Sequence, residues 1–130
     1  MPRFTFNKLV RDKIVSQQIA SGAKPSYRRL DAQEHASALI AKLHEETDEL
    51  AAASPENLAE EIADIQQVLD DLRSLHGIPQ AAVTAAQARK LHANGGFSDG
   101  IFIDSVETAE DDRWTAYYRA HPERYPEQKA

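Results

Sequence analysis

The sequence predicts an all-α fold that resembles a four-helix bundle, and three observations support this prediction. Hydrophobic residues recur with helical spacing over long segments, which favours amphipathic helices over strands. Residues that start and end helices divide the chain into segments of ordinary helix length. The chain has 130 residues, which suits one domain, and it contains no internal repeat and no low-complexity segment.

Capping residues define the first two predicted helices. Asn7 is expected to cap a helix over Lys8–Ala20, with Gly22 after its end because glycine readily adopts the left-handed conformation found there. Asp31 begins a pattern similar to a capping box, and a second helix is predicted from there to about Ala53.

Prolines open the third and fourth predicted helices. Pro55 directly follows a serine that can cap, and it predicts a helix that ends at His76. Pro79 then opens a fourth helix that runs through about Ala93. These four helices are the predicted elements of the bundle.

The C-terminal part of the sequence is expected to be less regular. Residues 94–96 predict a turn, and residues 97–103 predict a small extended piece, either a strand or a hairpin. Thr108 is expected to cap a short last helix through about Ala120, and the tail beyond it is expected to fray. Three aromatic residues of this helix are expected in core or subunit contacts, with base stacking as the alternative: Trp114, Tyr117 and Tyr118.

Composition and charge narrow the class of protein. Hydrophobic residues make up 42% of the chain, but many are alanine and only 7% of the chain is aromatic, so one copy would have a thin core. A homodimer or higher homo-oligomer is therefore expected. The net charge of −6 argues against binding to nucleic acid or to an anionic membrane, although it allows a nucleotide whose phosphates are bridged by metal.

The compartment is predicted from what the sequence lacks. There is no cysteine, so disulfides and cysteine-ligated zinc are excluded. No apolar run approaches the roughly 20 residues that span a bilayer, and the N-terminus has no signal-peptide pattern. These features predict a cytoplasmic protein.

Acidic residues interrupt the apolar face of the second predicted helix. At about 100° per residue, Leu39, Leu43 and Leu50 form one apolar stripe. Glu46 falls inside this stripe, Glu49 lies at its edge and Glu45 lies one step further round, whereas Asp48 points to the opposite face. The acidic side of the helix is therefore expected to face the protein interior.

The third predicted helix repeats this arrangement. Its apolar stripe is formed by Leu58, Ile62, Ile65, Leu69 and Leu72. Glu61 falls inside this stripe and Asp64 lies at its edge, whereas Glu60 points away. Because two helices joined by a short loop pack antiparallel, the inward carboxylates of both can meet. Several oxygen ligands in one place suit Mg²⁺ or Mn²⁺. The alternative is that these acids are ordinary solvated charges of helix surfaces.

Basic residues near both ends of this region are candidates for phosphate binding. The group comprises Lys8, Arg11, Lys13, Arg89 and Lys90, and Asn94 begins a glycine turn that brings backbone close to a ligand. Ion pairs with neighbouring acids are the alternative for the cations, and a simple helix-ending turn is the alternative for Asn94.

Several of these motifs together resemble a known enzyme superfamily. The opening Asn7-Lys8-Leu9-Val10-Arg11-Asp12-Lys13-Ile14 precedes Glu45-Glu46-x-x-Glu49, Glu61-x-x-Asp64 and Gly95-Gly96-Phe97. This set is similar to the all-α nucleoside triphosphate pyrophosphohydrolases, which include MazG-like proteins and phosphoribosyl-ATP pyrophosphohydrolase. The resemblance covers about residues 7–103 and leaves residues 105–130 unmatched. Two departures are Val15, where the family usually has proline, and a short gap between the acidic motifs.

The resemblance implies a MazG-type fold and a metal-dependent reaction. It implies Mg²⁺ bound by Glu46, Glu49, Glu61 and Asp64, with Glu45 as an accessory ligand or a residue that positions water. The expected reaction cleaves a nucleotide between its α- and β-phosphates to give a monophosphate and pyrophosphate, with Glu45 and Glu46 as catalytic residues. It also suggests removal of non-standard nucleotides.

Two other functions stay open from the sequence. One is a non-catalytic helical interaction module that retains the bundle without turnover. The other is phosphoribosyl-ATP hydrolysis in histidine synthesis. No residue of the sequence is assigned to recognition of a purine or pyrimidine base, so the preferred nucleotide is not predicted.

Overall fold

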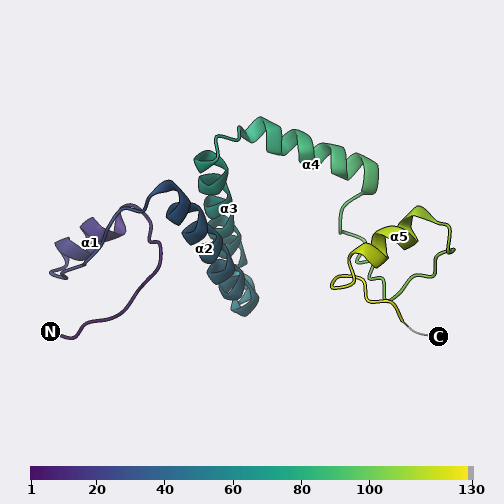
Figure 1. The fold of residues 1–130 in the computed structure, drawn as a ribbon. Helices are drawn as coiled ribbons and strands as arrows, with labels where there is room; N and C mark the ends of the chain where they lie inside the picture. The colour runs from purple at the N-terminus through teal and green to yellow at the C-terminus, as the bar shows by residue number, and fades with distance from the viewer. Residues whose placement is uncertain (129–130) are drawn as a thin grey trace. The chain divides into compact units, whose positions relative to one another are not determined.

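The computed structural model describes residues 1–128, and all of their regular secondary structure is helical (Figure 1). Within these residues there is no β-strand, which confirms the predicted all-α class. The α-helices are α1 (Ile14–Ala20), α2 (Ala32–Ala52), α3 (Leu58–Leu75), α4 (Gln80–Asn94) and α5 (Arg113–Ala120), and a short 3₁₀ helix η1 spans Pro55–Asn57. The chain divides into two compact units, and the second begins at Asn94.

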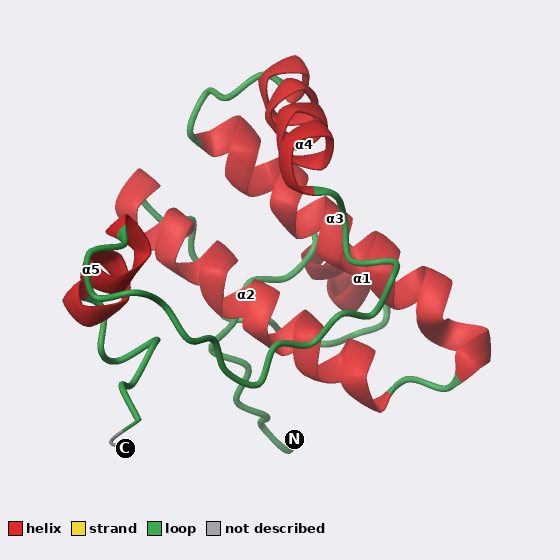
Figure 2. Cartoon of the chain, turned by 90° about the vertical axis from the view of Figure 1, so that its right-hand side faces the viewer, coloured by secondary structure: helices red, strands yellow, loops and turns green. Residues whose placement is uncertain are grey.

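The first unit is built on a hairpin of two long helices. α2 and α3 are joined by the short η1 connection and pack along each other as the sequence predicts (Figure 2). The Asp31 carboxylate accepts a hydrogen bond of 2.8 Å from the backbone N–H of Glu34, so it caps α2 as expected. Pro55 opens η1 rather than the α-helix itself, and α3 begins three residues later, at Leu58. This hairpin positions all the inward carboxylates.

The first helix is shorter than predicted. It begins at Ile14 instead of Lys8, and Asn7 does not cap it. Asn7 has a φ of 47°, in the left-handed region, so the chain turns there instead of entering a helix. Residues 8–12 lie outside any helix, and the side chains of Lys8 and Arg11 reach acidic residues of α2 and α3.

The second unit differs from the prediction in two ways. Residues 101–103 have no partner strand and remain highly exposed, so no ladder of hydrogen bonds forms. α5 is capped by Asp112, whose carboxylate accepts a hydrogen bond of 2.8 Å from the backbone N–H of Trp114. The Thr108 hydroxyl instead lies 2.6 Å from the buried Thr115 hydroxyl, which donates its proton to the Ala109 carbonyl.

The segment after α5 folds back onto it, so the prediction that the tail frays is wrong as far as Tyr125. The Tyr125 ring lies 4.8 Å from the Tyr118 ring and 5.9 Å from the Tyr117 ring, measured between centroids. Aromatic pairs at such distances gain energy beyond the area they bury. The aromatic residues of α5 therefore form a local cluster within the second unit, in which Trp114 and Tyr117 remain partly exposed, and their expected core or subunit contacts stay a prediction.

Very few apolar side chains in the described residues are buried. Leu39 and Val68 alone fall in the buried class among them, and both lie on the α2–α3 hairpin. Ile40, Ile62 and Leu69 on the same helices are more than 40% exposed. The core of a single chain is thus as thin as its alanine-rich composition predicts. No helix in residues 1–128 combines the length and the apolar character needed to cross a membrane.

Candidate metal centre

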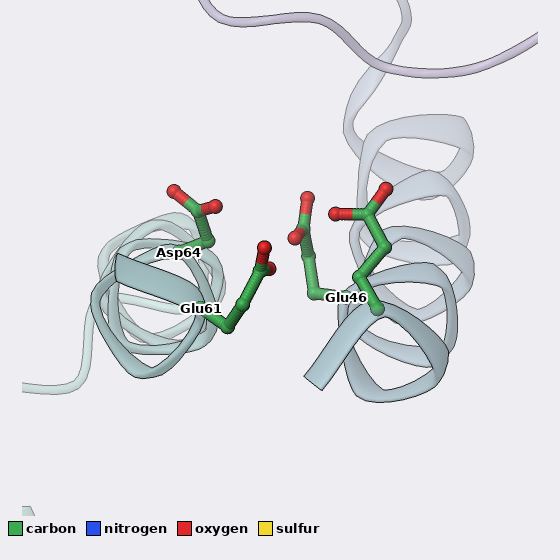
Figure 3. Close-up of side chains that lie close together, drawn as sticks. Glu46, Glu61 and Asp64 are labelled. Atoms are coloured by element: carbon green, nitrogen blue, oxygen red, sulfur yellow. The ribbon is translucent and has the colours of Figure 1, made fainter. Parts of the chain in front are cut away.

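Four carboxylates from the two helices of the hairpin meet at one place. Glu46 and Glu49 come from α2, and Glu61 and Asp64 come from α3. Each residue offers an oxygen atom, and these four atoms lie within 4.8 Å of one another. Figure 3 shows Glu46 reaching toward Glu61 and Asp64 from the opposite helix. We refer to these four residues as the carboxylate cluster.

Helix geometry explains why these residues meet. In each helix the two acids are three positions apart, which puts their side chains on one face of that helix. Packing of α2 against α3 then brings the two faces together. Asp48 and Glu60 are exposed and do not belong to the cluster, in agreement with the predicted faces.

Glu46 is the innermost member of the cluster. Its exposed fraction is only 6%, and its Oε2 atom is buried with no hydrogen-bond partner among the described residues. The Oε2 atom of Glu61 is also buried and unpartnered. Unpartnered polar atoms are uncommon in folded proteins and call for an explanation such as an ion or a water molecule.

Burial and mutual repulsion change the acidity of these groups. The pKa of Glu46 is raised above its ordinary value because its carboxylate is desolvated and faces Glu49 and Asp64. The pKa of Glu61 is also raised, first by desolvation and then by the charges of Glu49 and Asp64. In both groups desolvation is the largest cause, and the neighbouring carboxylates add to it.

Two cations among the described residues contact the cluster, one at Asp64 of α3 and one at Glu46 of α2. The Arg11 Nη2 atom lies 2.6 Å from Asp64 Oδ1, and the Lys42 Nζ atom lies 3.5 Å from Glu46 Oε1. When all four carboxylates are ionised, two negative charges are therefore left without a contacting cation from residues 1–128. Carboxylate oxygens are the preferred ligands of hard divalent cations, so the cluster could hold such an ion.

Lys42 was not singled out by the sequence analysis. It precedes Glu45 by three residues and Glu46 by four, which is the spacing that brings side chains together on a helix. Its Nζ atom lies 3.3 Å from Glu45 Oε2 as well as close to Glu46. This spacing is the signal in the sequence that identifies Lys42 as a partner of these carboxylates.

Glu45 lies beside the carboxylate cluster but outside it. Its carboxylate forms ion pairs with Lys8 at 2.9 Å and with Lys42 at 3.3 Å. The hydrogen bond from Lys8 and the contact with Lys42 lower the pKa of Glu45 despite partial desolvation. A carboxylate with a lowered pKa is a weaker base, so Glu46 is better suited than Glu45 to accept a proton in this arrangement.

The predicted phosphate-binding residues fall into two groups. Lys8 and Arg11 form ion pairs with acids of the hairpin, so ion pairing, the alternative to phosphate binding, is what the structure shows for these two cations. Lys13 precedes α1, and Arg89 and Lys90 lie on α4; within residues 1–128 none of these three forms an ion pair. Asn94 ends α4 and is the first residue of the second unit.

No protein-family model, curated protein or solved structure matches this chain. The functional assignment therefore depends on the carboxylate cluster, on its neighbouring cations and on the motifs of the sequence.

Proposed function

We propose that the carboxylate cluster binds a divalent cation, Mg²⁺ in the first place, with Mn²⁺ able to substitute. The observation that carries this proposal is the buried, unpartnered Oε2 atom of Glu46, which lies among three further carboxylates. An acid left in this state costs free energy unless a cation compensates it. The four oxygen donors match the ligand preference of hard cations, and a small inward movement of the side chains would suit the short bonds of Mg²⁺.

The chemistry that we propose for this site is hydrolysis of a nucleotide to a monophosphate and pyrophosphate. When bound, the metal would neutralise phosphate charge and lower the pKa of a water molecule. Glu46, Glu49, Glu61 and Asp64 would hold it. The pKa of Glu46 in the metal-free protein is raised by desolvation and by Glu49, so Glu46 would be a stronger base than Glu45. The resemblance to the all-α pyrophosphohydrolases supports the same reaction.

The neighbouring cations support a phosphorylated substrate. Lys8 and Arg11 lie at the edge of the carboxylates and have exposed side chains, so they are available to anionic groups at the metal. Phosphate groups are bound well by such charge-assisted hydrogen bonds. A phosphate monoester would make fewer contacts with the metal, Lys8 and Arg11 together than a nucleotide di- or triphosphate would.

A panel assay tests this proposal. Normal and modified nucleoside triphosphates, together with phosphoribosyl-ATP, would be incubated with Mg²⁺ or Mn²⁺ and assayed for products. At least one nucleotide should yield pyrophosphate and a monophosphate, and EDTA should abolish both because the cluster loses its cation. Orthophosphate as the primary product would instead place cleavage at another bond.

A non-catalytic interaction module is the second candidate function. The observation that favours it is a run of highly exposed apolar side chains in the second unit, including Phe97, Ile101 and Phe102. Absence of turnover across the whole panel, in a protein that still binds metal, would favour this candidate over the enzyme.

We further propose that the MazG-type bundle is completed by association of two or more chains. Exposed apolar residues on α2 and α3, such as Ile62 and Leu69, would become buried in that assembly. Light scattering at micromolar concentration should therefore give a mass of at least twice the 14.5 kDa of one chain. Ile62→Lys should shift the protein toward the monomer, whereas Gln67→Lys on the same helix should not. A parent protein with the mass of a single chain would refute the assembly.

A further inference from the structure

Residues 7–13, which we call the N-terminal strap, connect to both helices of the hairpin through their cations. Lys8 Nζ lies 2.9 Å from Glu45 Oε1 on α2, and Arg11 Nη2 lies 2.6 Å from Asp64 Oδ1 on α3. The two pairs therefore lie on opposite helices of the same site. One pair uses a member of the carboxylate cluster, and the other uses the acid directly beside it.

Both ion pairs are of a kind that is readily exchanged. The Arg11 and Lys8 side chains are 59% and 45% exposed, and neither is held by burial. Exposed ion pairs contribute little net stability because water solvates the separated charges well. Residues 8–12 are also outside any helix, so their side chains can turn without breaking helical hydrogen bonds.

Asp64 carries a single negative charge, which cannot compensate a bound divalent ion and the Arg11 guanidinium equally well at the same time. Its carboxylate has a guanidinium at 2.6 Å, and a divalent ion at the cluster would compete with that guanidinium for the same charge. Arg11 would then be released within reach of the metal. A released guanidinium beside a bound metal is suited to the oxygen atoms of a phosphate group.

We propose that Arg11 takes part in diphosphate binding by counter-ion exchange: it neutralises Asp64 when metal is absent and binds the diphosphate of a metal-bound nucleotide when metal is present. Lys8 is a second ligand that exchanges Glu45 for the diphosphate itself. This inference rests on the proposed metal site, and it names the diphosphate as the group that the strap recognises. It assigns different parts to the two cations. Arg11 competes directly with the metal because Asp64 belongs to the carboxylate cluster. Lys8 instead contacts Glu45 outside the cluster and interacts with the two cluster carboxylates of α2 only through longer-range attraction.

The exchange predicts opposite effects of one substitution on two affinities. Arg11→Gln removes the competitor of the metal, so Mn²⁺ alone should bind about two- to fivefold more tightly, as expected for loss of a weak exposed pair. The same substitution removes a phosphate ligand, so inorganic pyrophosphate should bind the Mg²⁺-loaded protein about tenfold or more weakly. Lys8→Gln should weaken pyrophosphate binding similarly and should tighten Mn²⁺ binding less than Arg11→Gln does, because its direct partner Glu45 lies outside the cluster.

The experiment measures Mn²⁺ binding by electron paramagnetic resonance and pyrophosphate binding by calorimetry. Arg28→Gln is the matched control, because it removes one positive charge and an exposed ion pair with Glu34 at 3.1 Å. It should change neither affinity. Circular dichroism of each variant would verify that the helices are retained.

Two results would overturn the exchange. If Arg11→Gln weakened Mn²⁺ binding, Arg11 would orient Asp64 for the metal rather than compete with it. If Mn²⁺ binding tightened while pyrophosphate binding stayed the same, Arg11 would not contact the diphosphate. Failure of the parent protein to bind Mn²⁺ would refute the proposed metal site itself, and the exchange with it, which distinguishes that failure from the two others.

Discussion

Glu46→Gln and Asp64→Asn should each lower the rate of pyrophosphate release by about 10²–10³-fold. Each change keeps the size of the side chain and removes one negative charge from the carboxylate cluster. A metal ion supplies several kcal/mol of stabilisation to developing charge, and each 1.36 kcal/mol corresponds to a factor of ten in rate. Initial rates on the best substrate of the nucleotide panel, at fixed Mg²⁺, would measure the effect.

Asp48→Asn and Glu60→Gln are the matched controls for this prediction. They make the same chemical changes on the same two helices, but both side chains are exposed and lie outside the cluster. Their rates should stay within about twofold of the parent, as is usual for surface substitutions away from a site. If the two control variants lost as much rate as Glu46→Gln and Asp64→Asn, the inward and outward faces of these helices would not differ in function.

Metal should also control the stability of the protein, and Glu46→Gln should largely remove this control. In EDTA the charges of Glu46 and Glu61 are desolvated and repelled by their neighbours, so the folded state is strained at neutral pH. At a metal concentration of a hundred times the dissociation constant, binding should stabilise the parent by ~2.7 kcal/mol. For a domain of this size that corresponds to a rise of about 10 °C in melting temperature.

The Glu46→Gln variant should melt at the parent temperature or higher in EDTA, and should gain little from metal. Lys42 is not stranded by the change, because it also contacts Glu45 at 3.3 Å. If Glu46 instead served a structural ion-pair network, its neutralisation would cost ~3–5 kcal/mol in EDTA, and added metal would have little effect on the parent. Thermal denaturation of both proteins with and without Mg²⁺ distinguishes these two outcomes.

The helices and the carboxylate cluster could be predicted from the sequence because both depend on local periodicity. The spacing of Glu46 and Glu49, and of Glu61 and Asp64, determines the helix faces on which they lie. A short connection between two amphipathic helices then leaves few ways for those faces to meet. The structure brings these four residues together as predicted.

The ends of the chain were predicted less well because tertiary contacts determine them. The helix expected from Lys8 begins six residues later, and the cation at its predicted start pairs with Glu45, 37 residues away. Such a long-range pair leaves no periodic signal in the sequence. The return of Tyr125 onto α5 likewise depends on aromatic packing that composition alone does not specify.

The most direct test of the metal site is calorimetric titration of the metal-free protein with Mn²⁺. The parent and Asp48→Asn should bind Mn²⁺ with the same affinity, and Glu46→Gln should bind it about 10- to 100-fold more weakly, since it lacks one buried ligand charge. Absence of Mn²⁺ binding by the parent at millimolar concentration, or equal affinity in Glu46→Gln, would contradict the assignment of the carboxylate cluster as a metal site.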